Sequence, residues 1–279
     1  MSSVVLSRQF NISGLTYSNC YNGSALSNGV YSIPNFVSKT DDIENIYVSV
    51  SHCEIPNSFY LINKHNNTLH INSTYYYLPY GNYNVSSLIT AMLLILPLTF
   101  SITYNTIYKK YTVLNSSSNF SIDNNKSTIT RVMGLGLTGI TVSTPFSTGY
   151  SVQLPNCVNF LPTPRVNIRS NKMKLQNFSS YDSSSDILTS VQNNASQSGM
   201  ITFINYTKAR YKIDVESIND LDIRITDDSN NDLDFNGVDW YIAIKVDYEY
   251  KLNYVGKKDA FSKILENNNE FLNMMNDEN

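Results

Sequence analysis

Residues 218–252, INDLDIRITDDSNNDLDFNGVDWYIAIKVDYEYKL, carry the clearest strand pattern in the chain. Apolar and polar residues alternate over 221–225 and again over 238–250, which places one face inward and the other outward. The residues between them, 227–232, are all Asp, Ser or Asn, which favour turns and interrupt a strand. The pattern therefore predicts one long β-hairpin.

The second arm of this hairpin has a well-specified inward face. Gly237, just before it, predicts a bulge or a tight corner. A register slip of one residue would expose the whole face to water and bury Asp239, Lys245 and Asp247. The residues expected to face inward are Trp240, Ile242, Ile244, Val246, Tyr248 and Tyr250.

The composition predicts an all-β protein. The 279 residues include 21 Tyr and 12 Phe, and only 15% are charged, which is typical of a chain rich in strand formers. From residue 43 onward, short apolar stretches alternate with Asn-rich turns, as a sandwich or barrel requires. One internal helix interrupts them: Asn84 is a suitable N-cap, an apolar stripe follows over 85–96, and Pro97 ends it.

The distribution of polar and apolar residues along the chain also predicts the domain organisation. Residues 1–40 are polar and lack a sustained period, so we expect an N-terminal arm. Residues 41–256 are expected to form a single domain, in which Pro and Gly recur over 138–165 and indicate a long loop or a small insertion. Residues 257–279 are expected to be a C-terminal tail.

Charge and cysteine content narrow the function classes. The formal net charge is −3 and there is no Lys/Arg run, so direct nucleic-acid binding is not expected. Three cysteines without CxxC spacing argue against a disulfide framework or a zinc site and favour a reducing compartment. The N-terminus lacks the pattern of a signal peptide, and the longest apolar run, 88–100, is too short to span a membrane.

The residues offer no convincing catalytic or metal site. The three histidines, His52, His65 and His70, do not form a ligand pattern. The acidic turn at 227–232 supplies oxygen ligands for calcium in outline, but Leu233 stands where a calcium loop needs Gly, so a solvated turn is the better interpretation. We therefore expect no enzyme activity, no metal and no cofactor.

The run Tyr75-Tyr76-Tyr77 has two interpretations. It is a stacking platform for bases or sugars, or it packs in a core or an interface. Strand alternation sends Tyr76 to the face opposite its neighbours, which favours packing.

The order of several motifs resembles a known family, the vertex or penton capsid proteins of virophages, Polinton-like viruses and related large DNA viruses. The resemblance covers residues 43–252 and rests on motif order. Its motifs are LPYGNY at 78–83, the helix at 85–96, RVMGLG at 131–136, NKMK at 171–174, SDIL at 185–188 and DFNGVDW at 234–240. The positions taken as its structural motif are Pro79, Gly81, Tyr83, Gly134, Phe235, Gly237 and Trp240.

The resemblance implies a single jelly roll of two antiparallel Greek-key sheets. It also implies a structural protein without catalysis, which forms a homopentamer at the icosahedral vertex of the virion and is assembled in the host cytoplasm. Implied partners are the major capsid protein and other minor capsid or host-attachment proteins. The alternative is a host-binding spike or lectin-like jelly roll, and a metal-dependent cupin enzyme is disfavoured by the histidines.

Overall fold

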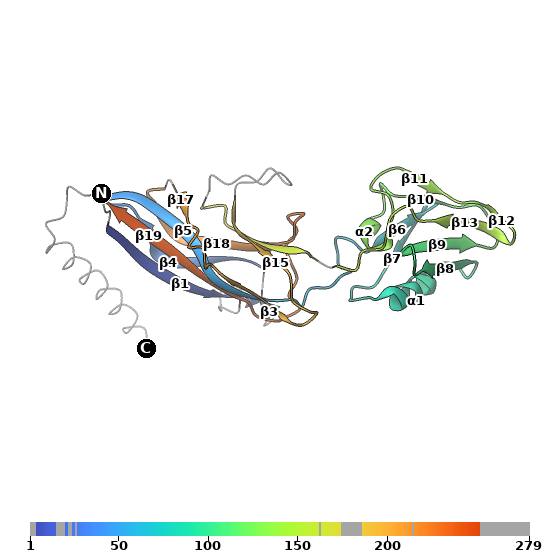
Figure 1. Ribbon diagram of the computed structural model, residues 1–279, viewed down its shortest axis with the longest axis horizontal. Helices are drawn as coiled ribbons and strands as arrows, with labels where there is room; N and C mark the ends of the chain where they lie inside the picture. Colours follow the sequence, from blue (N-terminus) through green and yellow to red (C-terminus); the bar gives the residue numbers. More distant parts are fainter. Residues whose placement is uncertain are drawn as a thin grey trace. The chain divides into compact units, whose positions relative to one another are not determined.

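The computed structural model describes residues 4–14, 20–21, 24–25, 27–161, 163–173, 186–213 and 215–251. The chain divides into two compact units (Figure 1). One unit combines Met1–Asn57 with Val166–Asn279, and the other is Ser58–Arg165. Because the second unit interrupts the sequence of the first, we call Ser58–Arg165 the inserted unit.

The first unit contains two large antiparallel sheets. The first sheet has the strand order β1-β19-β5-β16, and β17 also pairs with β5. Its strands are β1 (Val4–Ser13), β19 (Tyr241–Tyr250), β5 (Ile43–Pro56), β16 (Met200–Ile204) and β17 (Tyr211–Ile213). β16 and β17 pair with different parts of β5, so together they occupy one edge position.

The second sheet has the order β15-β14-β18-β4. Its strands are β15 (Ile187–Gln192), β14 (Arg165–Arg169), β18 (Ser217–Thr226) and β4 (Asn28–Ser38). A short pair, β2 (Cys20–Tyr21) with β3 (Ser24–Ala25), lies between β1 and β4 in the sequence.

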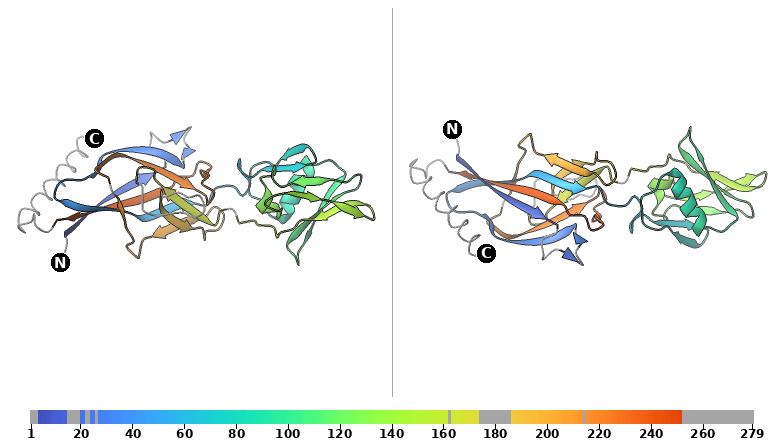
Figure 2. Two further views of the ribbon diagram at one scale, coloured as in Figure 1. Left: turned by 90° about the horizontal axis from the view of Figure 1, so that it is seen from above. Right: turned by 90° about the horizontal axis from the view of Figure 1, so that it is seen from below.

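The two sheets pack face to face as a jelly roll (Figure 2). The rings of Phe10 on β1 and Phe36 on β4 have centroids 4.7 Å apart, and the Tyr248 hydroxyl on β19 donates to the Phe36 carbonyl at 3.2 Å. The chain passes from one sheet to the other between successive strands of the two sheets, except between β14 and β15 and between β16 and β17, which share an edge. This is the two-sheet Greek-key arrangement of a jelly roll, so the expected fold class is confirmed.

The predicted hairpin at 218–252 is wrong, although its strands and their buried faces are right. Leu221, Ile223 and Ile225 on β18 are buried, as are Trp240, just before β19, and Ile242, Ile244 and Val246 on β19. The two strands nevertheless belong to opposite sheets, because β18 pairs with β14 and β4 whereas β19 pairs with β1 and β5. Alternation shows which face of a strand is buried but not which strand lies beside it.

The expected N-terminal arm over 1–40 is corrected by the structure. β1 pairs with β19 over its whole length, and β4 pairs with β18, so this segment supplies one strand to each sheet. Both are edge strands, in which polar residues separate the apolar ones. This spacing weakens the hydrophobic pattern by which a strand is recognised in the sequence. The tail at 257–279 lies outside the described residues.

The inserted unit holds two further antiparallel sheets and two helices around its own core. The sheet orders are β11-β10-β6-β7 and β12-β13-β9-β8. The strands are β6 (Thr68–Ile71), β7 (Thr74–Tyr77), β8 (Phe100–Asn105), β9 (Lys110–Asn115), β10 (Ser121–Asp123), β11 (Ile140–Val142), β12 (Thr144–Phe146) and β13 (Gly149–Gln153). The helices are α1 (Val85–Ile95) and α2 (Thr130–Met133).

The predicted helix is confirmed as α1. Asn84 caps it through a reciprocal box, in which its side chain accepts from the Ser87 amide and Ser87 Oγ accepts from the Asn84 amide, each at 2.9 Å. Leu88 and Met92 are its buried contacts with the core. The helix belongs to the inserted unit, which is larger than the insertion expected at 138–165 and divides the expected domain of 41–256.

Candidate functional site

The predicted motif residues of the jelly roll lie at one corner, before β19. Phe235 is fully buried, and the Val238 amide donates to its carbonyl at 3.1 Å across a turn. Asn236 and Gly237, the two central residues of this turn, have φ of 52° and 82°, as a type I′ turn requires. The turn leads the chain toward the first sheet, where Trp240 is 1% exposed and contacts Tyr31 of the second sheet edge-on.

The other motif residues belong to the inserted unit. Gly81 exchanges backbone hydrogen bonds with Ile62 at 2.9 and 3.0 Å, and the Tyr83 hydroxyl donates to the Pro79 carbonyl at 2.8 Å. Gly134 ends α2 with φ of 77°, and a Cβ there would stand 2.3 Å from the Asn156 carbonyl oxygen. The motif residues therefore form separate groups in the two units, and each group stabilises a turn.

The ionisable groups serve structural contacts. Among the residues that the structure describes, no group of three or more His, Cys, Asp or Glu could hold a metal ion. The carboxylate of Asp227 accepts from the amides of Ser229 and Asn231 at 2.8 Å, and so closes the acidic turn. Burial raises the pKa of the Cys53 thiol to about 12, which keeps it protonated and unreactive at neutral pH.

A buried polar cluster in the second sheet was not anticipated from the sequence. Arg169 is 1% exposed, pairs with Asp186 at 2.8 Å and donates to Thr226 Oγ1 at 2.9 Å. Next to it, Asp222 accepts from Ser170 Oγ at 2.6 Å. Strand alternation does not reveal that a buried position holds an arginine whose partner is distant in the sequence, so no sequence pattern could have predicted this cluster.

The exposed apolar side chains are concentrated in the inserted unit. Of the twenty large hydrophobic residues that are exposed in the described part of the chain, fourteen belong to Ser58–Arg165. The remaining six include Val5 and Val30 on β1 and β4, and Met200 and Ile204 at the two ends of β16. Exposed apolar surface of this kind marks contacts with other molecules when it is contiguous.

The β6–β7 hairpin of the inserted unit presents three rings on its outer face. Leu69, Ile71 and Tyr76 point into the core, as strand alternation predicted for Tyr76. Tyr75 and Tyr77 point outward, with their ring centroids 6.4 Å apart and their planes within 19° of each other. We call the exposed rings of Tyr75 and Tyr77, together with the buried ring of His70 on the same face, the aromatic platform.

The two units differ strongly in charge. The inserted unit contains six basic residues, Lys64, Lys109, Lys110, Lys126, Arg131 and Arg165, and one acidic residue, Asp123, for a formal net charge of +5. The rest of the chain contains 14 basic and 22 acidic residues, for a net charge of −8. The overall charge of −3 conceals this division.

Among known proteins, similarity to this chain is found only with solved structures. No protein-family model matches the chain, and no curated protein matches it. Within the described residues, no helix is long and apolar enough to cross a membrane.

Two solved structures are similar over most of the chain. The mavirus penton protein is 11% identical, with a TM-score of 0.45, covering 89% of this chain and 100% of that one. A chain in the cryo-EM structure of the Sputnik virophage is 12% identical, with a TM-score of 0.43, covering 88% of this chain and 98% of that one.

Proposed function

We propose that the chain is a non-catalytic structural protein of an icosahedral DNA virus, which forms a homopentamer at the five-fold vertices and contacts the major capsid protein. Jelly rolls of two Greek-key sheets serve as viral capsid domains, lectins and cupins. The observation that carries the proposal is this jelly roll in a chain whose motif order resembles penton proteins. The protein would then reside in the virion after assembly in the host cytoplasm, beside other minor capsid or host-attachment proteins.

The exposed apolar residues of the jelly-roll strands support a ring. A closed ring needs a heterologous interface, in which one flank of each copy meets the opposite flank of the next. One flank is formed by the edge strands β1 and β4, and the other by β15 and β16. Val5 and Val30 are exposed on the first flank, and Met200 and Ile204 on the second, so each flank carries apolar side chains for the other.

Native mass spectrometry of the purified 31.6-kDa chain tests this arrangement. We expect a pentamer for the unmodified protein and monomers for Val30→Asp and for Met200→Asp, because each substitution places a charge in the interface. Val238→Asp, at a residue of similar exposure (44%) in the turn before β19, which is not an edge strand, is the matched control and should remain pentameric.

Mixing the two variants gives the sharpest result. Each retains one intact flank, so an equimolar mixture should form dimers of one copy of each variant and no larger ring. A stable dimer or trimer of the unmodified protein, or unaffected pentamers of both variants, would refute the proposed ring.

A host-binding spike or lectin-like protein is the alternative. Cross-linking of intact particles separates the two functions, since a vertex protein links to the major capsid protein. Links to host receptors or glycans alone would identify a spike.

A further inference from the structure

The aromatic platform has the geometry of a ligand-binding surface. Tyr75 and Tyr77 are 47% and 61% exposed, whereas Tyr76, which lies between them on the short strand β7, is packed against the core. The two rings are nearly parallel, with centroids 6.4 Å apart, and both extend from the strand β7. Tyrosine exposes such area at low entropic cost, since its side chain has only two rotatable bonds.

The third ring of the aromatic platform belongs to His70. Its ring meets Tyr75 at a centroid distance of 4.5 Å, and it is only 4% exposed. Its Nδ1 atom is buried and has no hydrogen-bond partner among the described residues. A buried nitrogen without a hydrogen-bond partner is rare in proteins. A ligand hydroxyl would supply that partner if it shifted the edge of Tyr75.

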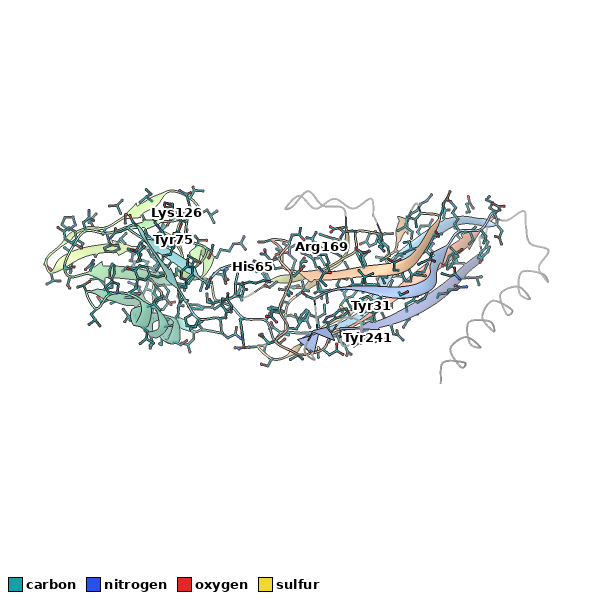
Figure 3. The ribbon with its side chains drawn as sticks, turned by 180° about the vertical axis from the view of Figure 1, so that it is seen from behind. Tyr31, His65, Tyr75, Lys126, Arg169 and Tyr241 are labelled. Atoms are coloured by element: carbon teal, nitrogen blue, oxygen red, sulfur yellow. The ribbon has the colours of Figure 1, made fainter. Side chains whose placement is uncertain are left out.

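A cation lies in the segment beside β6. The His70 amide donates to Ser127 Oγ at 3.0 Å, which places the segment 123–128 beside β6. Lys126 of this segment is in the same part of the inserted unit as Tyr75 (Figure 3). Its ion pair with Asp123, at 3.6 Å, is exposed and therefore weak, so the ammonium group remains available to a ligand.

We propose that the aromatic platform and Lys126 bind an acidic carbohydrate, a sugar that bears a carboxylate or a sulfate. The apolar C–H face of a sugar ring stacks on Tyr75 and Tyr77, while its hydroxyls bond to the polar groups of the hairpin. The anionic group lies toward Lys126, and the net charge of +5 on the inserted unit draws acidic ligands toward it. This binding does not depend on the proposed vertex role.

The surroundings of the platform favour a carbohydrate over nucleic acid. Single-stranded nucleic acid also stacks on aromatic rings, but it needs a row of cations along its phosphates. Residues 67–78 and 121–128, which form and flank the hairpin, contain Lys126 as their one basic residue. A single cation suits a ligand with one isolated negative charge.

Surface plasmon resonance of the immobilised full-length protein tests the proposal. The probes are sialyllactose, which carries one carboxylate, lactose monosulfate, which carries one sulfate, and neutral lactose. We expect one acidic sugar to bind more tightly than lactose, and the preferred one identifies the anionic group. Tyr77→Ala should weaken that binding about tenfold, the loss expected for one stacked ring.

Matched variants separate the platform from general effects. Tyr108 is 61% exposed, as Tyr77 is, and lies in another loop of the inserted unit, so Tyr108→Ala should bind normally. Tyr77→Phe keeps the ring and should retain binding. Lys126→Gln should weaken binding to the acidic sugar, whereas Lys109→Gln, which changes the net charge equally, should leave it unchanged.

Several results would overturn the proposal. These are the absence of binding to both acidic sugars, lactose binding as tight as theirs, or equal losses in the Tyr77→Ala and Tyr108→Ala variants. Tighter binding of an oligothymidylate than of either sugar would assign the platform to nucleic acid instead. Because the measurement reads binding by purified protein, its failure leaves the pentamer test unaffected.

Discussion

Gly14 and Trp240 form the tightest contact at the corner of the jelly roll. The Gly14 amide donates to the Trp240 carbonyl at 3.1 Å, and a Cβ on Gly14 would stand 2.5 Å from the indole Nε1. The buried tryptophan at position 240 therefore requires a glycine at position 14, directly after β1. Gly14 was missed in the sequence because nothing there indicates that β1 and β19 are partners.

Gly14→Ala is expected to destabilise the fold by about 1 to 3 kcal/mol, the usual cost of forcing extra volume into a packed site. Trp240→Ala should cost about 3 to 5 kcal/mol through the cavity that it leaves. Chemical denaturation measures both. Gly81→Ala is the control, because a Cβ there would meet Tyr83 at an ordinary 3.6 Å. If Gly14→Ala is as stable as Gly81→Ala, the proposed steric constraint is incorrect.

Gly134→Ala is expected to destabilise the inserted unit selectively. The residue has φ of 77° and its Cβ would overlap the Asn156 carbonyl oxygen, so both the backbone and the packing oppose it. Trp240 is the single tryptophan and belongs to the jelly roll, so its fluorescence reports that unit alone. Hydrogen exchange should show lost protection in residues 58–165 while the Trp240 unfolding transition stays unchanged. An equal shift of both would show that the two units unfold together.

The sequence predicted buried faces better than it predicted neighbours. Trp240 and Ile242 were assigned to the core correctly, since alternation depends only on the strand itself. Strand partners depend on contacts far apart in the sequence, which is why β18 and β19 were paired wrongly and β1 was taken for an arm. The same limit hid the inserted unit, because its ends at Ser58 and Arg165 lie far apart in the sequence.

The candidate site was only partly accessible from the sequence. Alternation correctly placed Tyr76 on the face opposite Tyr75 and Tyr77. It did not predict that these two rings would lie parallel and exposed, or that His70 would lie beside Tyr75, because β6 and β7 had to be paired first. The positive charge of the inserted unit became apparent only when its boundaries were known.

Deleting residues 1–13 is expected to prevent stable folding of the jelly roll. β1 pairs with β19 from Val4 to Ser13, so its removal would leave a long central strand with an unpaired, aggregation-prone edge. Deleting residues 252–279 removes none of the strands that the structure describes and should leave the Trp240 transition unchanged. Circular dichroism and Trp240 fluorescence compare the two deletions. A folded protein without residues 1–13 would restore the interpretation of this segment as an arm.

The carboxylate of Asp247 lies at the centre of a polar cluster on the first sheet. It accepts from Ser7 Oγ at 2.5 Å and from Lys245 Nζ at 2.9 Å, and Arg210 lies 3.6 Å away. Burial by itself raises the pKa of Asp247, but these hydrogen bonds and positive charges outweigh it and hold the pKa below its usual value. The folded state therefore favours the ionised carboxylate more than the unfolded state does.

Asp247→Asn is expected to lower the free energy of unfolding at pH 7 by roughly 1 to 3 kcal/mol, since charge-assisted hydrogen bonds are lost. The contribution of a carboxylate with a lowered pKa is present above its unfolded value of about 3.9 and is lost as the pH falls through the folded value. The difference between Asp247→Asn and the unmodified protein should thus shrink below about pH 4. Denaturation between pH 3 and pH 7 measures it, with Glu44→Gln, an exposed residue nearby, as the control for charge alone. A difference that is constant with pH would mean that Asp247 contributes through packing and not through its charge.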